Sequence, residues 1–222
     1  MTPSGDDRAT VRDLLGEHGR TYAEEAGIRL RDTPQPLYEL LVLAHLLSAR
    51  IRAAAAVAAA RCLFDDGMRD ARAMRDATWQ RRVDALGRGG YRRYDERTST
   101  QLGEAAELVL DRYGGDLRRM RDAAGGRPER IGELLREVPG IGPAGAAIFL
   151  REVQGVWPGV APYLDGRALD GARRLGLPAA PEKLARLVRE EELPSLAAAL
   201  VRAALDRHVV RDVEEARARH AA

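Results

Sequence analysis

The decisive stretch of this chain is Val138-Pro139-Gly140-Ile141-Gly142-Pro143-Ala144-Gly145-Ala146-Ala147, which predicts two short helices joined by a tight turn. Pro139 ends the first helix, and Gly140 and Gly142 allow the turn positive φ angles without a Cβ in the way. Pro143 suits the first turn of the second helix, where its missing N–H is no loss. The turn therefore leaves bare backbone N–H groups at a helix N-terminus, an arrangement that binds anions.

The anion expected at this turn is a nucleic-acid phosphate, because the hairpin has no side chain that reads a base. The residues assigned to phosphate contact are Gly140, Ile141, Gly142 and Ala144. The formal net charge of +2 does not exclude such a partner, since an acidic back face can balance a basic groove. Lys183 is the only lysine among many arginines, a bias that a GC-rich genome also explains.

The composition limits the class of protein further. With 222 residues the chain can form one sizeable core or two lobes that share it. A single cysteine, Cys62, excludes an internal disulfide and any four-cysteine iron–sulfur cluster. We find no N-terminal apolar segment and no long uncharged apolar run, so we expect a soluble cytoplasmic protein, associated with the nucleoid through DNA binding.

Apolar residues recur at helical spacing and never switch to period two, which predicts an all-α fold. Asp95 is a plausible cap for a helix that Gly114-Gly115 ends. Pro158 and Pro162 frame a loop, and residues 211–222 form either a helix end or a frayed tail. The predicted helices cover 37–51 with a continuation to Leu63, 95–112, a short helix opening at Arg127-Pro128-Glu129, 182–190 and 195–213.

Three segments resemble the helix-hairpin-helix DNA glycosylases, in that family's order. Residues 164–177, LDGRALDGARRLGL, align without a gap with the family's VDTHVRRVLARLGL, which places Asp165 on its invariant aspartate. Residues 37–50, LYELLVLAHLLSAR, are similar to the family's FELLVAVLLSAQ helix. Residues 91–97, YRRYDER, resemble the helix start written GLYNSKA. Together the likeness covers roughly residues 28–177.

The resemblance implies one unit over residues 1–222, built as two helical lobes with a groove between them. A six-helix lobe is expected at about 36–135. The second lobe would combine about 1–35 with 136–222 and carry both the hairpin (138–150) and Asp165. The similarity is to the endonuclease III-like branch, without its iron–sulfur cluster.

Asp165 is the candidate catalytic carboxylate. Breaking an N-glycosidic bond passes through a cation-like sugar, which a nearby carboxylate stabilises while orienting the attacking water. The same residue also suits an ordinary helix N-cap, and the two roles are compatible. Asp170 is interpreted as a solvated helix residue.

Two departures from the family pattern bear on the reaction. Gly166-Arg167 replaces the family's Thr-His, and Arg167 could pair with Asp165 and lower the pKa of its carboxyl. Ala144 stands where bifunctional members carry the lysine that forms a Schiff base. Lys183 lies far along the chain, so we expect base hydrolysis without AP-lyase activity.

Arg50 stands where relatives carry a glutamine that fills the gap left by an extruded base, and it also reads as a surface arginine. Arg93 and Arg97 are candidates for phosphate contacts, although arginines this common are often simply solvated. The residues assigned to a base pocket, each of which also fits a structural role, are Tyr91, Tyr94, Trp157, Tyr163 and Arg167.

His45, in an apolar stretch, is interpreted as a satisfied interior residue. His208 and His220 have no partner at metal-ligand spacing, so no transition-metal site and no cofactor is expected. The resemblance implies one exception, a monovalent cation held by the main-chain carbonyls of Arg136, Val138 and Ile141.

The sequence thus predicts a monomeric, monofunctional DNA glycosylase that acts on lesion-containing double-stranded DNA in base-excision repair. A non-catalytic DNA-binding protein with the same hairpin is the alternative, and a bare helical interaction protein leaves the glycine turn unexplained. Oxidised pyrimidine, alkylated purine, mismatched base and uracil all stay open as substrates.

Overall fold

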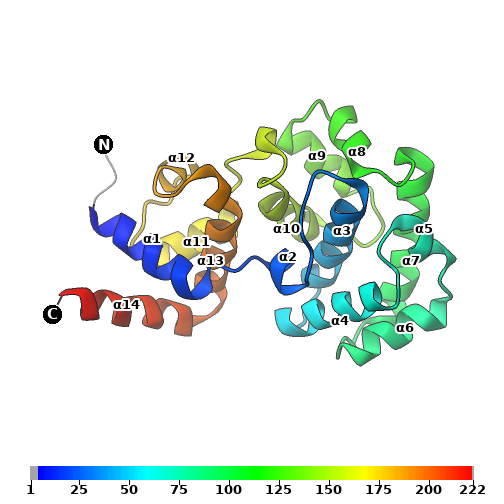
Figure 1. The fold of residues 1–222 in the computed structure, drawn as a ribbon, viewed down its shortest axis with the longest axis horizontal. Helices are drawn as coiled ribbons and strands as arrows, with labels where there is room; N and C mark the ends of the chain where they lie inside the picture. Colours follow the sequence, from blue (N-terminus) through cyan, green and yellow to red (C-terminus); the bar gives the residue numbers. More distant parts are fainter. Residues whose placement is uncertain (1–4, 222) are drawn as a thin grey trace. The chain divides into compact units, whose positions relative to one another are not determined.

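The computed structural model describes residues 5–221, which contain helices and no strand (Figure 1). The predicted all-α fold is confirmed. The chain divides into two compact units, which we call the terminal unit (Met1–Tyr22 and Arg151–Ala222) and the central unit (Ala23–Leu150). No helix in the described range is long and apolar enough to cross a membrane.

The central unit is built from nine helices, of which the first begins at its boundary and the last runs on into the terminal unit. They are α2 (Tyr22–Glu25), α3 (Pro34–Ser48), α4 (Ala53–Asp65), α5 (Ala71–Asp76), α6 (Trp79–Arg88), α7 (Asp95–Tyr113), α8 (Leu117–Ala123), α9 (Pro128–Leu135) and α10 (Pro143–Val153).

The terminal unit combines the first helix with the last third of the chain. Its elements are α1 (Gly5–His18), the 3₁₀ turn η1 (Pro158–Val160), α11 (Gly166–Arg174), α12 (Pro181–Ala185), the 3₁₀ turn η2 (Glu190–Glu192), α13 (Leu193–Leu205) and α14 (Arg207–Ala221).

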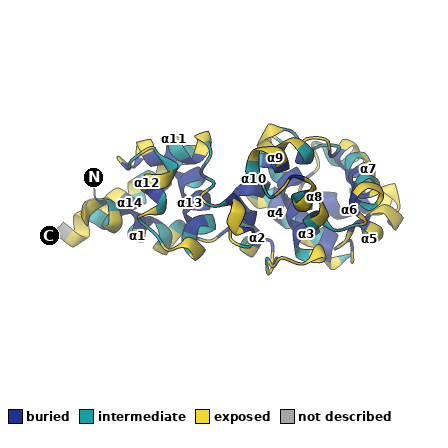
Figure 2. Cartoon of the chain, turned by 90° about the horizontal axis from the view of Figure 1, so that it is seen from above, coloured by how far each residue is buried: buried dark blue, intermediate teal, exposed yellow. Residues whose placement is uncertain are grey.

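Helix α3 is the centre of the central unit, because every residue from Leu37 to Leu46 on it is buried (Figure 2). The buried Arg82 ties three neighbouring segments together: its guanidinium donates to the carbonyls of Met74, Ala77 and Ser99. These bonds satisfy a charge that would otherwise be costly to bury. They fix α5, α6 and the start of α7, which supplies one wall of the pocket described below.

The core of the terminal unit forms where α11 packs on α13. Gly171 allows this close approach, since a Cβ there would lie 1.8 Å from the carbonyl oxygen of Leu200. Helix α1 packs against both α13 and α14, so the two ends of the chain share one core.

The boundaries of the two units differ from those of the predicted lobes. Residues 23–35 and 136–150 belong to the central unit, so the hairpin does not share a unit with Asp165. The reason is packing: a Cβ on Gly140 would meet His45 of α3, and Gly145 lies against Ser48 at the end of α3. These contacts fasten the hairpin to the central unit.

Several predicted helices have different limits. The helix over 37–63 breaks after Ser48 and restarts at Ala53, because Ala49 takes an extended conformation. The helix over 195–213 divides at Asp206, which is also extended and whose Oδ1 accepts from the N–H of His208. The helix over 182–190 shortens to α12, followed by η2.

Two other predicted helix limits are confirmed, and one predicted cap is wrong. Helix α7 ends at Gly114, as predicted, but its N-cap is Tyr94, and Asp95 lies in the first turn. Helix α9 opens at Pro128, and the tail from Arg211 continues α14 to Ala221. Ala222 lies outside the described residues.

Candidate functional site

The glycine turn joins α9 to α10 as predicted. Gly140 has a φ of 81°, in the region that favours glycine, and Ile141 N–H donates to the Val138 carbonyl at 3.0 Å. Gly142 does not have the predicted positive φ. Its carbonyl instead accepts the first bond of α10, from Ala146 N–H at 3.0 Å, which is the role of an N-cap residue.

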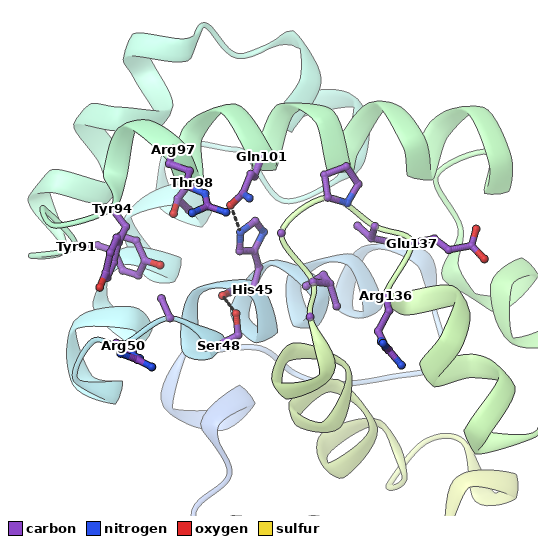
Figure 3. Close-up of a pocket in the computed structure, with 16 residues that line it drawn as sticks. His45, Ser48, Arg50, Tyr91, Tyr94, Arg97, Thr98, Gln101, Arg136 and Glu137 are labelled. Carbon is purple, nitrogen blue, oxygen red and sulfur yellow. Dashed lines mark hydrogen bonds between the residues drawn. The ribbon is translucent and has the colours of Figure 1, made fainter.

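His45 supports this turn from α3 (Figure 3). An ideal Cβ on Gly140 would lie 2.2 Å from the Cε1 atom of the His45 ring, so no larger residue fits without movement. The ring Nε2 lies 3.3 Å from Gln101 Oε1 on α7. The prediction of a satisfied interior histidine is confirmed, and the residue also joins α3, α7 and the turn.

The His45 imidazole is neutral at pH 7. Its pKa is lowered from about 6.5 to about 4: burial is the largest cause, the hydrogen bond to Gln101 opposes the shift, and the nearby Arg97 adds to it. Since Gln101 Oε1 is an acceptor, the neutral ring donates from Nε2–H. Gln101 lines the pocket, and its amide –NH₂ is a donor that this bond does not use.

A pocket of about 560 Å³ opens over these groups, entirely within the central unit (Figure 3). It brings together segments that are far apart in the sequence: the end of α3, the loop before α7, the first turns of α7 and the hairpin. Its lining residues are His45, Ser48, Ala49, Arg50, Tyr91, Tyr94, Arg97, Thr98, Gln101, Arg136, Glu137, Val138, Pro139, Gly140, Ile141 and Gly142.

The pocket is rich in unpaired cations. Arg50, Arg97 and Arg136 are exposed, and within residues 5–221 their guanidinium groups make no hydrogen bond or ion pair. The one carboxylate of the lining, Glu137, is bound by Arg112 from α7. The wall therefore presents donors and positive charge without a free carboxylate, which suits an anionic or acceptor-rich ligand.

The aromatic candidates behave differently from one another. Tyr91 is fully buried, so its ring belongs to the core, whereas Tyr94 is partly exposed. Arg93 is not in the pocket, and its guanidinium lies over the Tyr94 ring at 5.3 Å. Of the two tyrosines, only Tyr94 has an exposed part of its ring on which a base could stack.

The remaining predicted residues lie outside this pocket. Ala144 is exposed in the first turn of α10. Trp157, Tyr163 and Arg167 belong to the terminal unit, where Trp157 is buried in the core and Arg167 is exposed. Burial makes Trp157 a packing residue and not the stacking surface that the sequence predicted.

Asp165 is the N-cap of α11 and is 20% exposed. Its Oδ1 accepts from Ala168 N–H at 3.2 Å, and its Oδ2 accepts from Arg151 Nη1 at 2.6 Å. The predicted pairing with Arg167 is wrong: the partner is Arg151, which is buried on α10, whereas Arg167 points to solvent. Asp170 is exposed and pairs with Arg173, as expected of a solvated residue.

Arg151 is the functional candidate that sequence reasoning missed. It lies fourteen residues before Asp165 and is one of many arginines, so no local pattern distinguished it. The signal that could have found it is its position on the helix of the hairpin, directly after the apolar run 146–150, where a buried charge needs a partner.

The proposed monovalent-cation site stays a prediction. The Val138 carbonyl already accepts from Ile141 N–H, and a carbonyl oxygen has a second lone pair for a cation. The three carbonyls therefore fit such an ion on donor chemistry alone.

Comparisons with known proteins give a weak likeness. No family model matches the sequence, and no curated protein matches it. Among solved structures, a trapped endonuclease III–DNA covalent intermediate (estranged-adenine complex) is 19% identical, with a TM-score of 0.48 over 90% of this chain and 86% of that chain. A non-covalent endonuclease III–DNA complex is 16% identical, with a TM-score of 0.49 over 88% and 84%.

Proposed function

We propose that this chain is a monofunctional DNA glycosylase, which binds duplex DNA and hydrolyses the N-glycosidic bond of a damaged or mismatched base. The observation that carries the proposal is the pocket of the central unit. There the glycine turn and three unpaired guanidiniums from separate segments surround one hollow. Such a surface matches the phosphate-rich backbone of DNA better than any neutral ligand.

In this proposal Arg50 fills the space left by the extruded base, and Tyr94 offers a stacking face. Arg97 and Arg136 contact phosphates together with the N–H groups of the turn. The guanidinium groups of Arg50, Arg97 and Arg136 make no hydrogen bond or ion pair within the described chain, so they are available to such a ligand.

Asp165 is the proposed catalytic carboxylate. Each of its oxygens accepts one bond, from Ala168 or Arg151, and each keeps lone-pair capacity for a water molecule. The ionised group would stabilise the cation-like sugar and orient a water that adds to C1′. The C1′–N bond breaks, its electron pair leaves with the base, and the water proton is released or transferred to that base.

The proposed reaction ends at the abasic site. The turn and the first turn of α10 contain no lysine, because Ala144 occupies the matching position. The single lysine, Lys183, is exposed on α12. Without a lysine at this position, no side-chain amine is available there to form a Schiff base with the sugar, and strand cleavage would need added alkali.

A second candidate function has its own observation. Asp165 caps α11 and pairs with Arg151, which is a sufficient structural reason for an aspartate at this position. A DNA-binding protein without catalysis would keep the same pocket and the same cap.

One experiment separates the two. Base release from duplexes that carry oxidised, alkylated, mismatched or uracil bases is measured with and without hot alkali, for the wild type, Asp165→Asn and the exposed control Asp170→Asn. Asparagine keeps the N-cap, so α11 is preserved. We expect alkali-dependent strand breaks in the wild type and in the control. In Asp165→Asn the rate of base release should fall by a factor of roughly a thousand. DNA binding without release from any lesion would instead establish the non-catalytic binder.

A further inference from the structure

The seam between α1 and α14 contains an unexplained polar feature. Among residues 5–221, two buried side-chain atoms have no hydrogen-bond partner, namely Asp13 Oδ2 and His18 Nε2. Both belong to α1 and both face α14, which lies alongside it (Figure 1). Each atom instead faces one ionisable group on α14: Asp212 Oδ2 lies 3.3 Å from His18 Nε2, and His220 Nδ1 lies 3.5 Å from Asp13 Oδ2. Among the described residues, a third potential metal ligand lies close by only at His18.

At His18 the surroundings are those of a metal ligand. His18 Nε2 lies 3.3 Å from Asp212 Oδ2 on α14 and 3.9 Å from Glu17 Oε2, its neighbour on α1. One ligand atom from each of the three residues lies within 4.8 Å of the other two. Around a tetrahedral Zn²⁺ with bonds of about 2.1 Å, neighbouring ligand atoms are separated by roughly 3.4 Å. The observed spacing needs only small side-chain adjustments to reach that geometry.

We propose that Glu17, His18 and Asp212 form a Zn²⁺ site that ties the first helix of the chain to the last. An imidazole nitrogen favours zinc over magnesium or calcium, which take oxygen ligands. Two carboxylates balance the ionic charge of +2 and accompany one neutral ring. The partial exposure of the Glu17 and Asp212 side chains, 53% and 35%, leaves the fourth position open to water.

Coordination of Zn²⁺ would join two helices, α1 and α14, that are far apart in the sequence. Arg202 holds the adjacent main chain, because its Nη1 donates to the His18 carbonyl at 2.9 Å. The His18 ring is therefore set at a fixed helix end, and Asp212 on α14 is the ligand that metal binding would immobilise. Since the ion binds the folded arrangement, it stabilises the terminal unit in proportion to its affinity.

The same seam provides a matched control. His220 Nδ1 on α14 lies 3.5 Å from Asp13 Oδ2. This pair is also an imidazole beside a buried carboxylate. Within the described residues no third ligand completes that pair. A metal that merely collects on exposed histidines would bind there as readily, whereas the proposed site requires His18.

The test uses tag-free, chelator-treated full-length protein and Zn²⁺ alone, by calorimetric titration and by the thermal unfolding midpoint. Co²⁺ serves as a second probe, because tetrahedral coordination gives it visible absorption. We expect one ion per chain in the wild type and in His220→Ala. Affinity should fall at least about tenfold in His18→Ala and in Asp212→Asn, and the latter preserves the shape of the side chain.

Three results would overturn the site: no Zn²⁺ binding by the wild type, equal binding by His18→Ala, or equal loss in His220→Ala. Equal binding by all variants would locate the metal elsewhere, for example at Cys62. None of these measurements involves DNA, so the zinc site and the proposed glycosylase activity stand or fall separately.

Discussion

The pocket of the central unit and the Asp165 site of the terminal unit use charge in opposite ways. In the pocket, Arg50, Arg97 and Arg136 have no partner within the described chain and lie exposed. At the other site a single carboxylate is held by a backbone N–H and by the buried Arg151. Unpaired, solvated cations suit a ligand that brings its own negative charge. A carboxylate held by two hydrogen bonds instead keeps one fixed position, as a group that acts on a bound substrate must. Under the proposed function, binding and chemistry are therefore assigned to separate units of this chain.

Gly140→Ala, at the turn that lines the pocket, should give the largest effect, and it is an effect on stability. The substitution places a Cβ at positive φ and 2.2 Å from His45, so we expect a loss of about 3–4 kcal/mol in unfolding free energy. Urea denaturation measures it. Gly142→Ala is the control, because its φ is not positive and its Cβ meets nothing within 4 Å. Similar losses in both variants would contradict the contact between His45 and the turn.

Acidification should weaken the same contact. The pKa of folded His45 is about 4, below its unfolded value of about 6.5. The unfolded chain therefore binds more protons between these values, and the stability present above pH 6.5 is lost as the pH falls toward 4. The shift corresponds to roughly 3 kcal/mol.

The check is the urea midpoint against pH for the wild type and His45→Gln, which does not titrate. The urea midpoint of the variant should change less than that of the wild type between pH 6.5 and pH 4. Parallel curves would mean that His45 does not contribute to the acid sensitivity.

Arg151→Met sharpens the comparison on the side of the chemistry. Loss of a charge-assisted bond to Asp165 should slow base release by about 10–100-fold, since such bonds are worth roughly 1.5–3 kcal/mol. Single-turnover rates measure the effect, and DNA affinity should stay within about twofold of wild type. Arg167→Met is the matched control, because Arg167 is exposed and unpaired within the described residues. A larger effect in the control would restore Arg167 as the partner of Asp165.

Arg97→Gln should give the smallest change. Removing one phosphate contact makes the negative slope of log K against log salt less steep by about one. It also weakens binding by the same factor for all DNA sequences. Fluorescence anisotropy at several salt concentrations gives the slope. Arg130→Gln provides the comparison, because Arg130 is paired with Glu133 on α9 and lies outside the pocket. Equal slopes in the two variants would remove Arg97 from the DNA surface.

Local patterns in the sequence determined most of the secondary structure. The all-α fold, the start of α10 at Pro143, the turn at Gly140 and the end of α7 at Gly114 depend on backbone preferences that act over a few residues. The N-cap role of Asp165 is of the same kind, since its bond to Ala168 spans three residues. These features follow from dihedral limits and short-range hydrogen bonds, which a sequence displays directly.

Only the tertiary structure decided which distant groups meet. It paired Asp165 with Arg151 instead of Arg167, set His45 against Gly140, and buried Trp157 and Tyr91 as packing residues. It also brought Asp212 beside Glu17 and His18, where the histidine spacing in the sequence gave no sign of a metal. Such contacts depend on how helices pack, and that is fixed by the sum of many weak apolar contacts spread over the whole chain.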